Sequence, residues 1–182
     1  PFVSVENFWG EKGRRILSNA KVFVYLAHSS VPASDAADPW AELSENVDPT
    51  LRAISWALEC NPEMKVIYLS SGGQVYGKGH SSPIPESAPL APATPYGLGK
   101  TLIEEGLRYL SRVDEAAIGI LRVANPIGRW QSGGRQGLVA AAIKAARRGA
   151  ELALYGDGTN QRDYFDADEL AQAIDRVSGC LD

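Results

Sequence analysis

Short apolar runs alternate with longer helical stretches along this chain, and that alternation is the strongest constraint on its fold. The runs Lys21–Ala27, Lys65–Leu69 and Ala117–Val123 are apolar over most of their length, as strands buried on both faces are. Between them, Trp40–Cys60 and Tyr96–Val113 repeat apolar residues at helical spacing. The alternation predicts an α/β fold with a mostly parallel sheet covered on both faces.

Local signals indicate where the helices begin and end. Pro49 predicts a kink or a late start in the first helical stretch, because proline has no N–H to donate. Thr94 is suited to the N-cap of the second stretch, and Pro95 to its first helical position. In the C-terminal part, the sequence predicts a helix over Leu138–Arg148 ended by Gly149, and then a short strand over Glu151–Tyr155. A last helix is expected to start at a capping box formed by Asp166 and Glu169 and to end near Val177.

Composition excludes several classes of protein. The 22 acidic residues outnumber the 18 Lys and Arg, and the net charge of −4 leaves no broad basic surface for a nucleic-acid partner. No apolar run approaches the roughly 20 residues that a membrane helix needs, so we expect no membrane partner. Cys60 and Cys180 are too few for a disulfide scaffold and lack metal-ligand spacing. We therefore expect a reducing compartment, the cytoplasm.

Ligands of parallel α/β sheets bind beyond the carboxyl ends of the strands, which here means after Leu26, Leu69 and Val123. Small residues follow the first strand, where a flat ligand can approach the backbone. The Ser- and Gly-rich segment after the second strand has Gln74 where a G-x-G-x-x-G spacing needs glycine, and a Pro-rich loop follows it. That segment is therefore no phosphate-binding turn. Asn125 brings an amide to the end of the third strand.

The sharpest motif is Tyr96 with Lys100, because residues four apart on a helix share one face. A phenol with an ordinary pKa near 10 is a poor base at neutral pH, but a neighbouring ammonium stabilises the phenolate and lowers that pKa. Such a phenol can accept the proton of a substrate hydroxyl while hydride leaves the same carbon. A Tyr-x-x-x-Lys arises by chance in roughly one such chain in five, so the Ser-rich strand end and the proline-capped helix around it carry the argument.

Other polar residues remain open to two interpretations. Arg162 follows a Gly-rich turn, where it either binds a phosphate or forms a surface ion pair, and spacing alone favours neither. His28 and His80 have no metal-ligand partners nearby in the sequence, which favours a packing or loop role over a metal site. No metal is expected.

Taken together, these motifs resemble the extended short-chain dehydrogenase/reductase family, the NAD-dependent nucleotide-sugar epimerases and dehydratases. The resemblance runs from about Phe2 to about Val177. The matching blocks are Val24–Ala27, Asn46–Val47, Ser70–Ser71 with Val75–Gly77, Pro85–Glu86, Pro95–Lys100, Leu121–Pro126, and Gly156–Gly158 with Arg162–Tyr164. The order and separations of these blocks are specific to the family. They do not single out one substrate within it.

The resemblance implies a Rossmann-like doubly wound parallel sheet that binds NAD or NADP, and a smaller substrate domain for a nucleotide sugar. It implies that Tyr96 is the catalytic base and that Lys100 holds the nicotinamide ribose and lowers the tyrosine pKa. The cofactor-lining residues that it implies are Ala27, Asn46, Ser70 and Pro126, together with Tyr96 and Lys100. The substrate-binding residues that it implies are Asn125 and Arg162, which would grip the nucleotide diphosphate, with Gln131–Gly137 running past the same ligand.

The sequence departs from the family at its beginning. The Gly-rich phosphate turn that opens such folds is absent, and the family places it before the equivalent of Phe2. We therefore expect an interior piece of a longer chain, which by itself binds NAD weakly or not at all. We expect two parts in this piece. Residues 1–128 are the C-terminal portion of a Rossmann domain that is incomplete at the N-terminus. Residues 129–182 are part of a small C-terminal substrate-binding region, with the last strand and helix returning to the Rossmann domain.

Two further departures concern the catalytic residues. Gly72 stands where the family usually has Ser or Thr, whose hydroxyl hydrogen-bonds the reacting sugar oxygen. Ser71 is the adjacent candidate, but the alternation of a strand should turn it to the other face, and Gln74 or a water could substitute. Gly73 and Gln74 replace the Asp-Glu pair of the sugar 4,6-dehydratases and cannot act as acid and base, which disfavours a dehydratase.

The leading hypothesis is an NAD-dependent nucleotide-sugar 4-epimerase, in which Tyr96 takes the proton of the 4-hydroxyl as hydride leaves C4. A 4-ketoreductase of the same family would share Tyr96 and Lys100. The second alternative is a catalytically inactive nucleotide-sugar-binding module, which Gly72 and the absent phosphate turn motivate. The family also implies a homodimer through the helices around Trp40–Cys60 and Tyr96–Val113.

Overall fold

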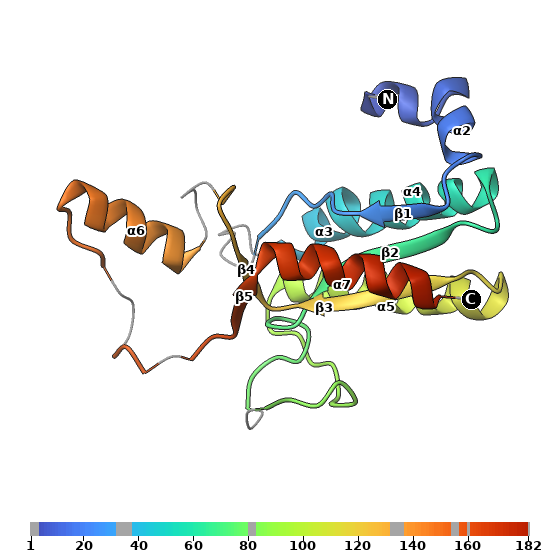
Figure 1. Cartoon of the computed structure of the whole chain (residues 1–182). Helices are drawn as coiled ribbons and strands as arrows, with labels where there is room; N and C mark the ends of the chain where they lie inside the picture. Colours follow the sequence, from blue (N-terminus) through green and yellow to red (C-terminus); the bar gives the residue numbers. More distant parts are fainter. Residues whose placement is uncertain are drawn as a thin grey trace.

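Three parallel strands form the centre of the protein (Figure 1). The computed structural model describes residues 4–31, 38–79, 83–131, 137–153, 157–159 and 161–181. The strands are β1 (Val22–Tyr25), β2 (Lys65–Ser71) and β3 (Ile118–Val123), in the order β1-β2-β3. They pair in register, with Val22 beside Lys65 and Val66 beside Ile118. The prediction of a parallel α/β sheet is confirmed.

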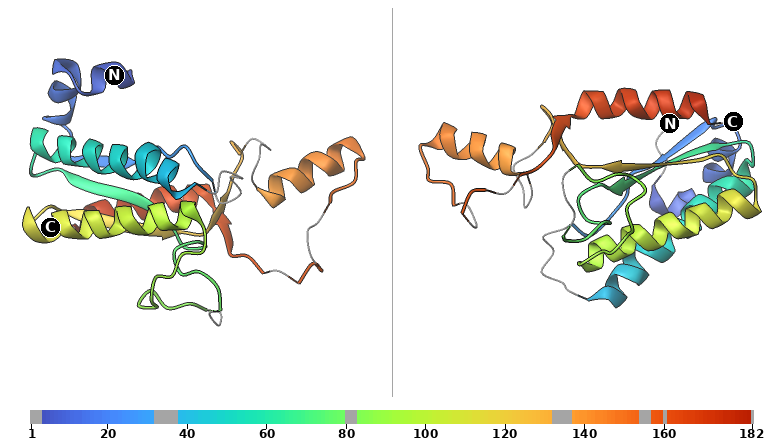
Figure 2. Two further views of the ribbon diagram at one scale, coloured as in Figure 1. Left: turned by 180° about the vertical axis from the view of Figure 1, so that it is seen from behind. Right: turned by 90° about the horizontal axis from the view of Figure 1, so that it is seen from below.

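Helices cover both faces of this sheet (Figure 2). In the right-hand view, α7 (Ala167–Cys180) lies on one side, and α4 (Asp48–Cys60) and α5 (Pro95–Val113) lie on the other. A side chain at Gly119 of β3 would overlap Val177 of α7, so glycine lets this helix approach the sheet closely. β2 is central and covered on both faces, which is why it reads as a nearly continuous apolar run.

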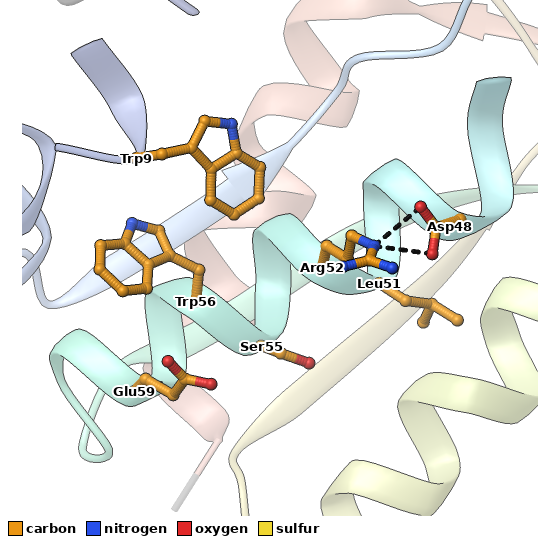
Figure 3. Close-up of a pocket in the computed structure, with 7 residues that line it drawn as sticks. All are labelled: Trp9, Asp48, Leu51, Arg52, Ser55, Trp56 and Glu59. Atoms are coloured by element: carbon orange, nitrogen blue, oxygen red, sulfur yellow. Dashed lines mark hydrogen bonds and ion pairs between the residues drawn. The ribbon is translucent and has the colours of Figure 1, made fainter. Parts of the chain in front are cut away.

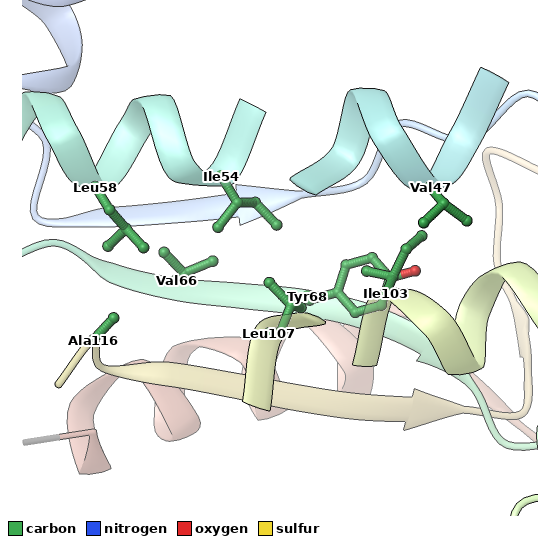
Figure 4. Packing of buried hydrophobic residues seen from close by; sticks show 8 residues of the cluster. All are labelled: Val47, Ile54, Leu58, Val66, Tyr68, Ile103, Leu107 and Ala116. Atoms are coloured by element: carbon green, nitrogen blue, oxygen red, sulfur yellow. The ribbon is translucent and has the colours of Figure 1, made fainter. Parts of the chain in front are cut away.

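The hydrophobic core lies between the sheet and the α4–α5 layer (Figure 4). Its buried members come from β2, from the segment before β3, and from the helices of that layer: Val47, Ile54, Leu58, Val66, Tyr68, Ile103, Leu107 and Ala116. Full burial of one such aliphatic side chain contributes roughly 1.5–3 kcal/mol. This core fixes α5 against β2, and α5 carries the Tyr-x-x-x-Lys motif.

The first long helical stretch is built from three successive pieces. α3 (Pro39–Glu42) passes into a π-helical turn, η1 (Leu43–Val47), and then into α4. Pro49 lies in the first turn of α4, and its missing N–H prevents a regular α-helical hydrogen bond to the turn before it. The irregularity that Pro49 predicts takes the form of a π-turn just before it, and the helical stretch begins at Pro39 without a late start.

α5 begins as its sequence predicts. The Thr94 hydroxyl accepts a hydrogen bond from the Gly97 N–H at 3.0 Å, and Pro95 is the first helical residue. Among the described residues, the long segment between β2 and Thr94 contains no helix or strand. Its path is fixed by a sharp turn at Gly77, where φ is +76° and a side chain would overlap the Ala91 carbonyl.

Two short helices precede the sheet. α1 (Val5–Phe8) and α2 (Glu11–Leu17) pack beside the C-terminal half of α4. The indole N–H of Trp56 donates to the Phe8 carbonyl at 3.2 Å, and the Arg14 guanidinium lies 4.3 Å from the Trp56 ring centroid. These contacts anchor the N-terminal helices to the edge of the core.

The C-terminal third differs most from its prediction. β4 (Asn125–Ile127) and β5 (Tyr164–Asp166) form a separate parallel pair that the sequence did not indicate. The strand expected over Glu151–Tyr155 is wrong for its described residues, 151–153, which adopt no strand. α6 (Leu138–Arg148) has its expected bounds, with Gly149 at φ +59° as its C-cap. The capping box of α7 is present, but the helix continues to Cys180.

Within the described ranges, no helix combines the length and apolar character required to span a bilayer. Cys60 and Cys180 are both free thiols.

Candidate active site

Tyr96 and Lys100 lie on the face of α5 that is turned toward the carboxyl end of β2. Lys100 is only 6% exposed, and its ammonium donates to the Leu69 carbonyl of β2 at 3.0 Å. The same nitrogen lies 4.9 Å from the ring centroid of Tyr68 and 5.6 Å from that of Tyr96. The structure therefore brings the predicted phenol and ammonium together at the strand end.

Burial dominates the electrostatics of Lys100. Desolvation lowers the pKa of its ammonium to about 8, while the carboxylates of Glu42 and Glu104 act in the opposite direction. Within the described part of the chain, no carboxylate forms a direct ion pair with Lys100. Its charge at neutral pH therefore depends on these two acids, which act on it without contact.

The pKa of Tyr96 is raised, which is opposite to the predicted effect of a neighbouring lysine. Burial of the phenol is the largest cause, a hydrogen bond with Ser71 partly offsets it, and the carboxylate of Glu42 raises the pKa further. The prediction failed because it weighed one favourable charge and left out the cost of desolvating a phenolate. A proton acceptor at Tyr96 needs further positive charge beside it.

Ser71 joins this pair, contrary to the expectation from strand alternation. Its hydroxyl is hydrogen-bonded to that of Tyr96. Ser71 is the last residue of β2, and Tyr96 lies in the first turn of α5, so the phenol meets the strand at its end. Alternation describes side chains along a strand, and it does not exclude a partner at the strand end. The candidate catalytic group is thus Tyr96, Lys100 and Ser71.

Gly72 and Gln74 contribute no polar group to the phenol. A Cβ at Gly72 would lie 3.0 Å from the Arg122 carbonyl, which is tighter than ordinary van der Waals contact. The Gln74 amide oxygen accepts from the Thr94 hydroxyl at 3.2 Å and so belongs to the start of α5. Of the substitutes considered for the family hydroxyl, Ser71 is the one that reaches Tyr96.

A buried polar cluster follows β1 on the other side of Tyr96. Asn46 accepts from the Ser29 N–H at 2.8 Å and donates to Glu42 at 3.2 Å, so its amide fixes the turn after β1. Glu42 also accepts from the Ser30 hydroxyl at 2.6 Å. His28 packs edge-on against the Tyr96 ring, with centroids 5.1 Å apart. The predicted cofactor-lining residue Asn46 is thereby engaged within the protein.

A second buried polar cluster, centred on Glu104, joins β2, β3 and α5. The fully buried carboxylate of Glu104 accepts from Ser70 at 2.5 Å, from Arg108 at 2.8 Å and from Arg122 at 2.8 Å. Arg122 also donates to the Tyr76 hydroxyl at 2.8 Å and to the Glu86 carbonyl at 2.9 Å, which ties the long loop to β3.

Sequence reasoning missed the role of this second cluster. Glu104 follows Lys100 by four residues, so the spacing that singled out Tyr96 and Lys100 also places Glu104 on their helix face. The hydroxyl of Ser70, predicted to line a cofactor, is committed to Glu104. Burial by itself would raise the Glu104 pKa, but the hydrogen bonds from Arg122 and Ser70 outweigh it and lower that pKa.

The remaining predicted residues are spread along the sheet edge. Ala27 is exposed two residues after the end of β1, and Pro126 lies half-buried in β4 opposite Phe165. The Asn125 amide donates to the Asp163 carbonyl at 2.9 Å, which joins β4 to β5. Arg162 is exposed, and its guanidinium donates to the neighbouring Gln161 carbonyl. Of the stretch Gln131–Gly137, residues 132–136 lie outside the described ranges, as does His80.

Comparisons with known proteins identify the family. The model of the NAD dependent epimerase/dehydratase family matches residues 11–179. The chain is 33% identical over 159 residues to UDP-glucose 4-epimerase of Mycolicibacterium smegmatis, covering 87% of this chain and 50% of that protein. It is 30% identical over 157 residues to dTDP-4-dehydro-6-deoxyglucose reductase of Escherichia coli, covering 86% and 49%.

A solved structure shows the same fold. UDP-N-acetylglucosamine 4-epimerase from Methanobrevibacter ruminantium, in complex with UDP-N-acetylmuramic acid, matches with a TM-score of 0.83 and 27% identity, covering 91% of this chain and 54% of that one. The chain thus spans about half the length of the relatives it matches. The family match and the Rossmann-like sheet agree, and the chain belongs to the NAD-dependent epimerase/dehydratase family of enzymes.

Proposed function

We propose that the protein is an NAD-dependent nucleotide-sugar 4-epimerase in which Tyr96 holds the proton of the sugar 4-hydroxyl. One observation carries this proposal: the Tyr96 hydroxyl is hydrogen-bonded to Ser71 beside the buried ammonium of Lys100. The similarity to UDP-glucose 4-epimerase of M. smegmatis and to a UDP-N-acetylglucosamine 4-epimerase supports the same reaction and substrate class.

The sheet edge fits the nicotinamide cofactor of the family. Ala27 is small and exposed, and no atom lies within 4 Å of a Cβ built at Gly73, so the ends of β1 and β2 leave space for a flat ring. In this proposal, Ala27, Lys100 and Pro126 hold the cofactor. When bound, NAD supplies the acceptor and later the donor of the C4 hydride, and its positive charge favours the Tyr96 phenolate.

The chain's own residues manage the proton. Tyr96 accepts the proton of the 4-hydroxyl and returns it when the epimer forms. Lys100 supplies a fixed positive charge near the phenol, and its bond to the Leu69 carbonyl holds it in place. Ser71 orients the phenol oxygen and takes the place of the hydroxyl that the family usually carries at position 72. Asn125 and Arg162 are the proposed contacts for the nucleotide diphosphate, and Arg162 must turn from the Gln161 carbonyl to reach it.

A 4-ketoreductase is the second candidate, and the similarity to the E. coli reductase favours it. It would use the same Tyr96 and Lys100, with Tyr96 giving its proton to the 4-keto oxygen. The two reactions differ in their balance, because a reductase consumes one NAD(P)H for each product whereas an epimerase regenerates its cofactor. The near-ultraviolet absorbance of NAD(P)H during turnover separates them. An inactive binding module is a third candidate, which Gly72 supports.

A substrate deuterated at C4 tests the proposal in the full-length protein. The protein is incubated with a UDP-sugar deuterated at C4, and NMR follows the product. We expect the 4-epimer to form with the deuterium retained at C4, because hydride leaves and returns to the same carbon. Nucleotide-sugar binding without turnover would reject the enzyme in favour of the binding module. Loss of the label to solvent would reject the hydride route.

We also propose a homodimer through the outer surfaces of α4 and α5. α5 exposes Leu102, Tyr109 and Val113, with Tyr109 56% exposed. A hollow of about 450 Å³ lies beside α4, lined by Trp9, Asp48, Leu51, Arg52, Ser55, Trp56 and Glu59 (Figure 3). Analytical ultracentrifugation of the full-length protein tests this assembly. We further propose that residues 1–128 are part of a Rossmann domain and that residues 129–182 are part of a substrate-binding region. The proposed location is the cytoplasm.

A further inference from the structure

Glu42 is a buried acid that the proposed reaction does not use. Its side chain is 4% exposed and comes from α3, at the point where the helix changes to the π-turn. One carboxylate oxygen, Oε2, accepts from Ser30 and Asn46. The other, Oε1, has no hydrogen-bond partner in the described structure, and neither ring nitrogen of His28 has one. A buried carboxylate with an unsatisfied oxygen is costly, and a positive charge nearby would offset part of that cost.

The carboxylate is pressed against the helix that carries the catalytic pair. A side chain at Gly99 would overlap Oε1, Cγ and Cδ of Glu42, so the carboxylate lies directly on the backbone beside Lys100. His28 connects it to the phenol: Nε2 lies 3.1 Å from Oε1 of Glu42 without hydrogen-bond geometry, and the imidazole packs against the Tyr96 ring. Glu42 therefore packs on the backbone of α5 next to Lys100 in the chain and reaches the Tyr96 ring through His28.

Glu104 also raises the pKa of Lys100, but its effect is smaller than that of Glu42. Glu104, one turn along α5, is bound by the guanidinium groups of Arg108 and Arg122. Burial and the charge of Lys100 lower the pKa of His28 to about 4, so this imidazole is neutral at physiological pH and does not cancel the charge of Glu42. Tyr68 of β2, whose pKa burial raises, is neutral as well.

We propose that Glu42 is a positioning residue of the Tyr96–Lys100 pair: a buried counter-charge, held by Ser30 and Asn46, that keeps the Lys100 ammonium protonated without binding it directly. The inference rests on the proposed function for the roles of Tyr96 and Lys100. Lys100 remains free to donate to the Leu69 carbonyl and to a ligand because Glu42 packs on Gly99 and forms no ion pair with the ammonium in the described structure. An ammonium this deeply buried would otherwise lose its charge near neutral pH.

Direct titration of Lys100 tests this proposal. In full-length protein with ¹³C- and ¹⁵N-labelled lysine, NMR follows the Lys100 side chain with pH, and Lys100→Arg assigns its signal. Glu42→Gln keeps the shape of the side chain and removes the charge, and it should lower the Lys100 pKa from about 8 by about one unit. The phenol of Tyr96, titrated in the same samples with labelled tyrosine, should also move to lower pKa, because Glu42 raises both values.

Matched variants separate charge from packing. Glu45→Gln removes an exposed carboxylate three residues further along the chain and should leave the Lys100 pKa unchanged, and Glu42→Asp, which keeps the charge, should lower it by less than Glu42→Gln. Glu42→Met replaces Glu42→Gln if circular dichroism shows that the latter is unfolded. A Lys100 pKa that stays constant in Glu42→Gln or Glu42→Met overturns the proposal, as does an equal fall in Glu45→Gln or Glu42→Asp. This titration reports on Glu42 whether or not the deuterium experiment finds turnover.

Discussion

Glu104→Gln removes the carboxylate on which β2, β3 and α5 converge. Glu104 is fully buried, and it accepts hydrogen bonds from Ser70 and from the two guanidinium groups of Arg108 and Arg122. Glutamine has nearly the same volume, so the core keeps its packing. What is lost is the charge, and the Arg122 guanidinium, 15% exposed, is left without its counter-ion.

The cost of this change can be bounded from the structure. Removing one partner of a buried ion pair destabilises a protein by about 3–5 kcal/mol. Two features place Glu104→Gln at the lower end of that range, near 3 kcal/mol. Arg108 is 35% exposed and keeps its bond to Glu105, and Arg122 keeps the Tyr76 hydroxyl and the Glu86 carbonyl. Urea unfolding followed by tryptophan fluorescence measures the difference in the free energy of unfolding.

The matched control is Glu105→Gln on the same helix. Glu105 binds the same Arg108 but is 59% exposed, so its loss should cost no more than about 0.5 kcal/mol. The effect of Glu104 should also depend on pH. Because its folded pKa is lowered, its contribution is present above 4.5, the ordinary value, and is lost as pH falls through the folded value. Equal losses in the two variants, or a difference between wild type and Glu104→Gln that stays constant in acid, would contradict a role for the Glu104 charge in holding the core together.

Two further substitutions test how α5 is positioned. Gly99→Ala places a methyl group against Glu42 and should destabilise the protein by about 1–3 kcal/mol. Gly179→Ala in α7, where no atom lies within 4 Å of the new methyl group, should instead stabilise it by up to about 1 kcal/mol, and thermal unfolding that ranks the two the other way would contradict the packing described. Thr94→Ala removes the N-cap of α5 and should cost about 1 kcal/mol. Thr101→Ala, in the helix interior, should cost less than half of that in chemical denaturation, and equal costs would argue against the cap.

Much of the fold follows from local signals in the sequence. The apolar runs predicted β1, β2 and β3 to within a few residues, because strands packed into a helix-covered sheet are mostly apolar, and β2 is buried on both faces. Thr94 and Gly149 marked helix ends that the structure confirms. β4 and β5 escaped prediction because each is three residues long, and such short strands carry no periodicity of their own.

The sequence predicted which residues meet at the candidate site, but it did not predict the direction in which the pKa of Tyr96 is shifted. The four-residue spacing placed Tyr96 beside Lys100, and the rule that ligands bind beyond the carboxyl ends of parallel strands indicated where to look for the site. Burial of the phenol reversed the expected direction of its pKa shift, and a sequence cannot show how deeply a group is desolvated. Glu42 escaped notice for a related reason: the π-turn that precedes Pro49 sets which residues of this helix face the sheet.

Replacement of Tyr96 by phenylalanine removes the proposed proton acceptor and leaves the ring that packs against His28, so it isolates the role of the phenol hydroxyl. Turnover of UDP-sugars by the full-length protein is measured for Tyr96→Phe and for Tyr109→Phe, which removes an exposed phenol from the same helix. We expect Tyr96→Phe to lower kcat at least about a hundredfold and Tyr109→Phe to retain wild-type turnover. Turnover by Tyr96→Phe within about threefold of wild type would contradict the role of Tyr96 as proton acceptor.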